Sequence, residues 1–323
     1  MSGVIRPTDE TVEHVLAGAP SYRFNNLSMS SNGMVAYVDK THIRVENAPK
    51  RTGRLIPVAA AKLVQQVKFV TIDCKEYLVV TSDVGVHLFD SAGATLLSYL
   101  STDKIHEKIE NHPENDPERM EYCCTAEGLH GTSMLLVGTS RGALAMLHYD
   151  ARKKTLSVEH VACGHRRPVC AVATSVSYIA SGDESGQVTV LAADFFAEHC
   201  RFPSMGAPCC SVEIRAGMII AAFVTGVVRV YSITHSHLQI EVDAHCRALN
   251  SMAMHPSANA FATCGEDGFV NVWELPSKQC DDLRLVSSDH FKDRFLVGVS
   301  FFKDNSNKLA ATAYDSAFLL TRV

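Results

Sequence analysis

The sequence lacks the features that mark several large classes of protein. No apolar run approaches the roughly 20 residues that a membrane helix needs. There is no Gly-rich phosphate-binding loop and no CxxC pair, so nucleotide chemistry and a structural zinc site have no support. The N-terminal stretch MSGVIRPTDE has neither the layout of a signal peptide nor that of a transit sequence. These absences favour a non-secreted, cytoplasmic protein, without excluding the nucleus, that uses no cofactor and no metal.

The charge balance excludes a further class of partner. The formal net charge is −5, whereas phosphate binding needs a basic face, so nucleic acid is not expected to be the main partner. Membrane and small-molecule partners are not expected either. The remaining expectation is a protein that binds other proteins.

Cysteine is not scarce, but its pattern argues against disulfides. Eleven cysteines is an odd number, and several lie in apolar, strand-like runs, such as Cys124, Cys170 and Cys264. The adjacent pair Cys209-Cys210 cannot form an unstrained disulfide with itself. We therefore expect buried, reduced thiols. One reactive cysteine remains as the enzymatic alternative.

Long helical patterns are nearly absent, and a strand–turn–strand pattern recurs instead. A clear copy is FATCGEDGFVNVWEL, residues 261–275. Seven copies occur in all, at residues 34–47, 78–90, 135–150, 179–194, 219–232, 261–275 and 309–323. The first six are spaced by 40 to 44 residues, apart from one interval of 58. That period is typical of a four-stranded propeller blade.

The repeat predicts an all-β fold in a single domain covering residues 1–323, a β-propeller with seven blades. Six blades is the alternative count, because the register of the last copy is the least regular. The chain stops directly after the third strand of that copy, and an unassigned strand-like segment lies at residues 11–16. We expect this N-terminal strand to complete the last blade and remove two exposed sheet edges.

The sixth copy also places a hydroxyl, a carboxylate and the only tryptophan at regular intervals, with a histidine upstream. These residues are His245, Thr263, Asp267 and Trp273. In a hydrolase such a set would be catalytic. The set resembles the signature of the WD-repeat propellers, and this resemblance implies a structural hydrogen-bonded tetrad in which the tryptophan covers the hydroxyl. Longer stretches, clearest between residues 203 and 275, are similar to one member of that family in particular.

The other copies match the WD-repeat signature less well. The fourth copy keeps Gly164-His165 and Ser181, but has Ser185 at the Asp position and Leu191 at the Trp position. We therefore expect a complete tetrad in the sixth copy alone.

The long interval of 58 residues contains an acidic insertion between two blades, residues 101–121. Its candidate docking residues are Asp103, Glu107, Glu110, Glu114, Asp116 and Glu118. Ile105 and Ile109 are four residues apart, which predicts one or two helical turns from Asp103 to Asn111. The segment is either a solvated loop or an element that docks a basic partner. In both cases its excision is expected to leave the fold intact.

The resemblance implies that partners bind at the rim where the turn after the second strand meets the loop before the first strand. The matching residues are Arg141, Arg166, Arg167, Glu184, Arg247 and Glu266. Arginine forks make bidentate contacts with carboxylates, so this rim suits an acidic peptide.

The resemblance implies a non-catalytic interaction scaffold, a subunit or adaptor of a multi-subunit intracellular complex, with ciliary and cytoskeletal assemblies as candidates. Tyr149-Asp150-Ala151-Arg152 is also similar to the Trp-Asp-x-Arg box of some WD-repeat propellers that dock onto cullin-type ubiquitin ligases. A substrate receptor of such a ligase is therefore the alternative function.

Overall fold

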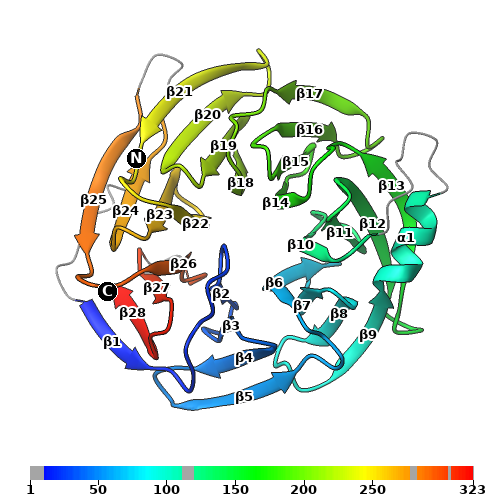
Figure 1. Ribbon diagram of the computed structural model, residues 1–323, viewed down its shortest axis with the longest axis horizontal. Helices are drawn as coiled ribbons and strands as arrows, with labels where there is room; N and C mark the ends of the chain where they lie inside the picture. The colour runs from blue at the N-terminus through cyan, green and yellow to red at the C-terminus, as the bar shows by residue number, and fades with distance from the viewer. Residues whose placement is uncertain (1–10, 111–119, 277–281, 305–306, 323) are drawn as a thin grey trace.

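Seven four-stranded antiparallel sheets surround a central channel in the computed structural model, which describes residues 11–110, 120–276, 282–304 and 307–322 (Figure 1). The predicted seven-bladed propeller is confirmed, and the alternative count of six blades is wrong. The second and third strands of every blade are the two strands of one of the seven sequence repeats.

The strands of each blade run from the channel outward in chain order, except in blade 7. Blade 1 contains β2 (Ser28–Met29), β3 (Val35–Asp39), β4 (His42–Asn47) and β5 (Thr52–Pro57). Blade 2 contains β6 (Val64–Ile72), β7 (Lys75–Ser82), β8 (Gly85–Asp90) and β9 (Leu96–Ser101). Blade 3 contains β10 (Cys123–Gly128), β11 (Met134–Thr139), β12 (Ala143–Asp150) and β13 (Thr155–Cys163). Blades 4 and 5 contain β14 (Val169–Thr174), β15 (Tyr178–Asp183), β16 (Val188–Ala192) and β17 (Glu198–Phe202); and β18 (Cys209–Arg215), β19 (Met218–Phe223), β20 (Val227–Ser232) and β21 (His237–Asp243). Blades 6 and 7 contain β22 (Leu249–Met254), β23 (Ala260–Gly265), β24 (Phe269–Glu274) and β25 (Arg284–His290); and β26 (Leu296–Phe301), β27 (Leu309–Ala313), β28 (Phe318–Arg322) and β1 (Thr11–Val15).

The core lies between the blades. The described residues form seven apolar clusters, one at each junction of neighbouring blades. The middle strands are therefore buried on both faces, as in β11 and β19, where every residue after the first is buried. Outer strands such as β5 are mostly exposed, because they pack on one side only. This arrangement explains why the apolar, β-branched sequence repeats coincide with the middle strands.

The N-terminal strand closes the ring, as expected from the sequence. β1 pairs antiparallel with β28, with Val12 opposite Thr321. The Thr321 hydroxyl also donates to the Val12 carbonyl at 3.1 Å. Beyond the strand, Leu16 is buried in the apolar cluster between blades 7 and 1. Blade 7 is thus built from both ends of the chain.

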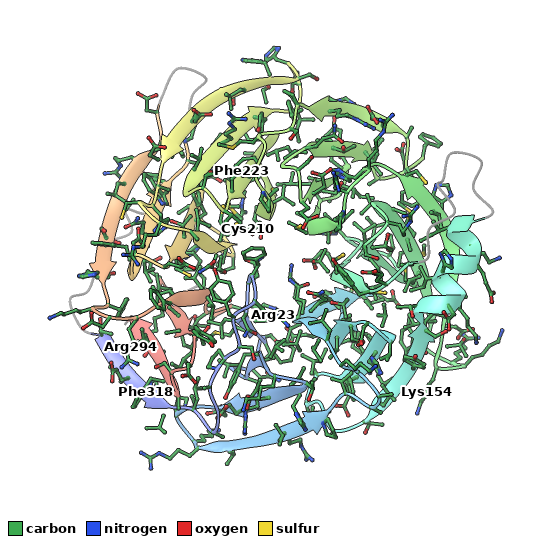
Figure 2. The ribbon with its side chains drawn as sticks, viewed as in Figure 1. Arg23, Lys154, Cys210, Phe223, Arg294 and Phe318 are labelled. Carbon is green, nitrogen blue, oxygen red and sulfur yellow. The ribbon has the colours of Figure 1, made fainter. Side chains whose placement is uncertain are left out.

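The segment between β1 and β2, residues 16–27, crosses one end of the channel; we call it the channel loop. Arg23 Nε donates to the Val64 carbonyl of blade 2 at 3.1 Å, and Asn25 Nδ2 donates to the Cys210 carbonyl of blade 5 at 2.7 Å. The Asn26 amide donates to the Val297 carbonyl of blade 7. Figure 2 shows Arg23 over the central opening. The loop therefore ties the first strands of several blades together across the axis.

The acidic insertion contributes a helix, α1 (Thr102–Glu110), outside blades 2 and 3 (Figure 1). The expected helical turns are confirmed over this range. Ile105 and Ile109 are buried in the cluster between these two blades, so a solvated loop is the wrong interpretation here. Asn111, Glu114, Asp116 and Glu118 lie outside the described residues. Among the described helices, none is long and apolar enough to cross a membrane.

Candidate interaction surface

The four residues singled out in blade 6 meet in one hydrogen-bonded chain. His245 Nδ1 lies 2.9 Å from Asp267 Oδ1, and its Nε2 lies 2.9 Å from Thr263 Oγ1. Trp273 Nε1 donates to the same hydroxyl at 3.1 Å. Thr263 is 0% exposed, so no substrate can reach the hydroxyl. The tetrad joins the turn, two strands and the entering loop, and its role is structural.

Blade 4 contains a second network, which corrects the sequence analysis. His165 Nε2 lies 2.7 Å from Ser181 Oγ, and its Nδ1 lies 3.0 Å from Asp183 Oδ2. The carboxylate thus follows the hydroxyl by two residues here, whereas it follows by four in blade 6. Ser185 does not replace it, because the Ser185 hydroxyl itself donates to Asp183 at 2.7 Å. This blade lacks only the tryptophan, whose place is taken by Leu191.

The candidate rim residues all lie on one face, which we call the upper face. This face carries the turns between second and third strands and the loops that enter the first strands. Arg166, Arg167, Glu184 and Arg247 are exposed, while Arg141 and Glu266 are half-buried. Backbone hydrogen bonds divide them into two groups. The Glu184 amide donates to Pro168 near Arg166 and Arg167, and the Glu266 amide donates to Ala248 near Arg247.

Three exposed aromatic residues on the upper face were missed by the sequence analysis. Tyr22, Phe295 and Tyr314 are 39%, 48% and 47% exposed, and we call them the aromatic cluster. The rings of Tyr22 and Tyr314 meet edge to face at 5.9 Å, and the Tyr314 amide donates to the Phe295 carbonyl. The Tyr22 hydroxyl donates to Glu266 at 2.6 Å. Burial first, and then this carboxylate, raise the pKa of Tyr22 to about 12.

No sequence pattern pointed to the aromatic cluster, because its members come from three separate loops. Tyr22 belongs to the channel loop, and Phe295 and Tyr314 come from different connections of blades 6 and 7. Only the closed ring brings these loops together. Residues scattered in this way carry no periodic signal.

The segment Tyr149-Asp150-Ala151-Arg152, which is similar to the cullin-docking box, begins in the last two residues of β12. Tyr149 is buried and meets the Tyr77 ring edge to face at 5.4 Å. Asp150 accepts hydrogen bonds from the amides of Arg152 and Lys153, which caps its own turn. Of the aromatic and charged residues of this box, only the Arg152 side chain is exposed.

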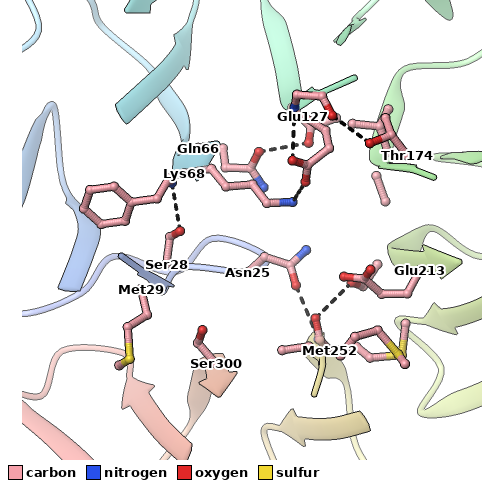
Figure 3. Close-up of a pocket in the computed structure, with 18 of the residues that line it drawn as sticks. Asn25, Ser28, Met29, Gln66, Lys68, Glu127, Thr174, Glu213, Met252 and Ser300 are labelled. Atoms are coloured by element: carbon pink, nitrogen blue, oxygen red, sulfur yellow. Dashed lines mark hydrogen bonds and ion pairs between the residues drawn. The ribbon is translucent and has the colours of Figure 1, made fainter. Parts of the chain in front are cut away.

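The central channel is the second candidate site. A cavity of about 530 Å³ is lined by residues of the first strands, among them Lys68, Glu127 and Glu213 (Figure 3). Lys68 and Glu127 form an ion pair. Glu213 faces this pair from the other side of the cavity (Figure 3). Burial raises the pKa of Glu213 to about 7; Lys68 and Arg215 oppose this rise and Glu127 adds to it.

The buried cysteines show no activation. Burial raises the pKa of Cys123 and of Cys170 to about 12 and raises those of Cys209 and Cys264 well above the ordinary value. A nucleophilic thiol needs the opposite shift. In the described part of the chain, no group of three or more His, Cys, Asp or Glu side chains is placed to hold a metal ion.

Comparison with known proteins agrees with this geometry. A model of the WDR54 family matches residues 52–322. The chain belongs to the WDR54 family. WD repeat-containing protein 54 from Homo sapiens is 26% identical over 267 residues, which cover 79% of this chain and 77% of the human protein. The protein of the same name from Mus musculus is 24% identical over 269 residues, 80% of this chain and 78% of the mouse protein. The similarity to one WD-repeat protein, noted between residues 203 and 275, is to this protein and is confirmed.

A solved structure shows the same fold. A chain in the crystal structure of the mitotic checkpoint complex superposes with a TM-score of 0.76 and 17% identity, over 99% of this chain and 92% of that chain. WD-repeat propellers are generally non-catalytic, and membership of a WD-repeat family suggests a protein-interaction scaffold.

Proposed function

We propose that this protein is a non-catalytic scaffold that binds a partner protein on its upper face, as a subunit or adaptor of a larger intracellular assembly. The aromatic cluster carries the proposal. Tyr22, Phe295 and Tyr314 are exposed on the upper face, with the Tyr22 and Tyr314 rings in contact and Phe295 joined to Tyr314 through the backbone. Tyrosine and other aromatic residues are enriched at the centres of protein interfaces. The Tyr22 side chain is held by its hydrogen bond to Glu266, and the Tyr314 backbone is held by the Phe295 carbonyl.

The charge of the upper face favours an acidic partner segment. Arg247, Arg166 and Arg167 are exposed on the same face as the aromatic cluster. An extended acidic peptide that places an apolar residue on the cluster can reach one or both arginine groups with its carboxylates. Such pairs at the edge of an interface set orientation and association rate more than affinity.

The acids of α1 provide a second contact for the same scaffold. Asp103 and Glu107 are exposed on a helix that is anchored by Ile105 and Ile109. An anchored acidic helix suits a basic segment of another subunit, on the outer edge of the ring rather than on its upper face. A role as a ubiquitin-ligase receptor is not part of the proposal, because Tyr149 packs against Tyr77 of blade 2 and Asp150 caps its own turn.

The test compares partners recovered by tagged full-length variants, measured by quantitative mass spectrometry. The double variant Tyr22→Ser and Tyr314→Ser should lose a defined set of partners at least fivefold. Phe195→Ser is the matched control, because Phe195 is 79% exposed in a turn on the opposite face of blade 4. Asp103→Lys with Glu107→Lys tests the helix separately.

The thermal melting temperature of each variant shows whether the ring is intact. A folded double variant that recovers the same partners in the same amounts as the unchanged protein would refute binding through the aromatic cluster. Loss of the same partners in Phe195→Ser would also contradict the proposal, since that residue lies on the other face.

A further inference from the structure

The first strands of the blades place equivalent residues at the same height around the channel, as their register shows. The first strands of blades 2 to 7 each carry a register shift at the same place, and the residues directly after it are Gln66, Thr125, Ala171, Ser211, Ser251 and Gly298. Two residues further along, the same strands carry Lys68, Glu127, Ala173, Glu213, Ala253 and Ser300, which we call the channel layer. Five of these residues line the cavity, whereas Ala173 is buried in the cluster between blades 4 and 5. Three members of this channel layer are thus small and neutral, and three are charged.

The charges of the channel layer do not cancel. Lys68 pairs with Glu127, and Glu127 Oε1 also accepts the Gly128 amide at 3.0 Å. Glu213 lies across the cavity from this pair (Figure 3). Among the described residues, no side chain or amide donates a hydrogen bond to the Glu213 carboxylate. The layer therefore holds one carboxylate more than its single cation can neutralise.

The lining of the cavity extends to exposed residues on the face opposite the aromatic cluster. At the upper end the channel loop crosses the axis, and Asn25 is one of the residues that line the cavity. At the other end the lining includes Cys74, His130 and Gly131, which are exposed residues at the turns that follow the first strands. The entrance thus lies on the face opposite the aromatic cluster.

We propose that the channel layer is a binding site for a guanidinium or primary ammonium group, which Glu213 receives opposite the Lys68–Glu127 pair. The cavity of about 530 Å³ admits a group of arginine size with ordered water. Hydroxyl oxygens of Ser211, Ser251 and Ser300 line it and offer further acceptors to N–H donors. The cation is either a small free amine or a basic side chain of a bound protein, and both present the same chemistry.

The protonation of Glu213 supports this assignment. Burial raises the pKa of Glu213 to about 7; Lys68 and Arg215 oppose this rise, and Glu127 adds to it. An added cation beside the carboxylate lowers that pKa again. Binding at neutral pH should therefore release protons, which an anionic ligand would not cause.

The experiment measures binding to the full-length protein by titration calorimetry at pH 8, where Glu213 is ionised. The probes are agmatine, which represents a free amine, and N-acetyl-arginine N-methylamide, which represents a side chain in a peptide. Both should bind, or the second alone if the source is a protein. The citrulline analogue, which is neutral and of the same shape, should not bind.

Glu213→Gln should weaken the binding of the probes at least tenfold, because it removes the charge and keeps the shape. Glu159→Gln, an exposed change on the outer strand of blade 3, is the matched control and should bind like the unchanged protein. Equal affinity of the Glu213→Gln variant, or no binding of either probe at 10 mM, overturns the proposal. So does equal affinity for the citrulline analogue.

Two exposed thiols give an independent readout of the binding position. Cys74 lines the cavity at its entrance, whereas Cys246 lies on the upper face beside His245. A saturating probe should slow maleimide labelling of Cys74 at least threefold and leave Cys246 unaffected. Protection of Cys246 instead would place the ligand on the upper face and overturn the assignment to the channel. The outcome is separate from that of the aromatic cluster, which lies on the other face.

Discussion

In blade 4, His165 Nδ1 lies 3.0 Å from Asp183 Oδ2, and both side chains are almost completely shielded from water. A neutral imidazole protonated on Nδ1 donates to the carboxylate and accepts from Ser181. Asp183 also accepts from the Ser185 and Gln187 amides, at 2.9 and 3.0 Å. One carboxylate therefore holds the entering loop of the blade to the turn between its second and third strands.

Asp183→Ala should destabilise the protein more than Ser185→Ala in the same turn. It leaves the buried His165 without its acceptor and frees the turn amides, at a cost of about 2–4 kcal/mol. Ser185→Ala is the control, since it removes one hydroxyl that donates to Asp183 and should cost less than about 1 kcal/mol. Urea unfolding, followed by the fluorescence of Trp273, the single tryptophan, measures both. Equal costs for the two variants would contradict the assigned role of Asp183.

The sequence predicted the blades because their signal is local. Each repeat combines two apolar strands with a tight turn. In five blades one equivalent position lies directly after a register shift between the third and fourth strands, and it holds Phe89, Leu147, Leu191, Tyr231 or Trp273. The position of Asp183 could not be predicted in the same way. It depends on how the turn after Ser181 folds, and a spacing taken from blade 6 does not apply to it.

The candidate sites depend on the closed ring, which explains why most of them were missed. Glu213 occupies a strand with the ordinary pattern CCSVEIR, and it becomes part of a site only when several first strands face one axis. Tyr22 and Tyr314 are 292 residues apart in the chain and meet because β1 completes blade 7. The rim arginines were predictable, because the turn of each repeat and the loop that enters a first strand lie on the same face.

Deletion of residues 1–18 should lower the melting temperature by roughly 10 °C or more. The deletion removes β1, exposes the edge of β28 and takes Leu16 out of the cluster between blades 7 and 1. A synthetic peptide of residues 11–18, added in excess, should restore part of the loss, because it can pair with β28 in trans. A truncated protein that melts at the same temperature as the full chain would show that β1 does not close the ring.

Glu213→Gln should stabilise the protein at pH 8 and leave it nearly unchanged at pH 4.5. The pKa of Glu213 is about 7 in the folded protein, against an ordinary value of 4.5, so ionisation costs the folded state. This penalty is fully present above pH 7 and disappears as the pH falls towards 4.5. We expect Glu213→Gln to raise the free energy of unfolding by about 1–3 kcal/mol at pH 8. This is less than the full pKa shift of Glu213 implies, because water reaches the cavity.

The pH dependence of this variant is measured by urea unfolding at both pH values and compared with that of Glu159→Gln. At each pH, the free energy of unfolding of the unchanged protein is subtracted from that of the variant. This subtraction removes the contribution of carboxylates with lowered pKa values, such as Asp183 and Asp267. Glu159 is exposed, so its variant should show no difference at either pH. A stabilisation of Glu213→Gln that is equal at pH 4.5 and pH 8 would rule out an ionisation penalty.

Ile105→Ala should destabilise the protein by about 2–4 kcal/mol, although the residue belongs to an insertion between blades. Ile105 is 0% exposed and lies with Ile109 and Met120 in the cluster that joins blades 2 and 3. Lys104→Ala, one residue earlier on the exposed side of α1, should change the stability by less than about 0.5 kcal/mol. The sequence alone suggested that excision of residues 103–119 leaves the fold intact. We expect instead that the excision destabilises the fold, because it opens this junction to water. Chemical unfolding of Ile105→Ala, Lys104→Ala and the excised protein measures the contribution of α1 to stability. If the excised protein is as stable as the full chain and Ile105→Ala does not change the stability, α1 packs on the propeller without stabilising it.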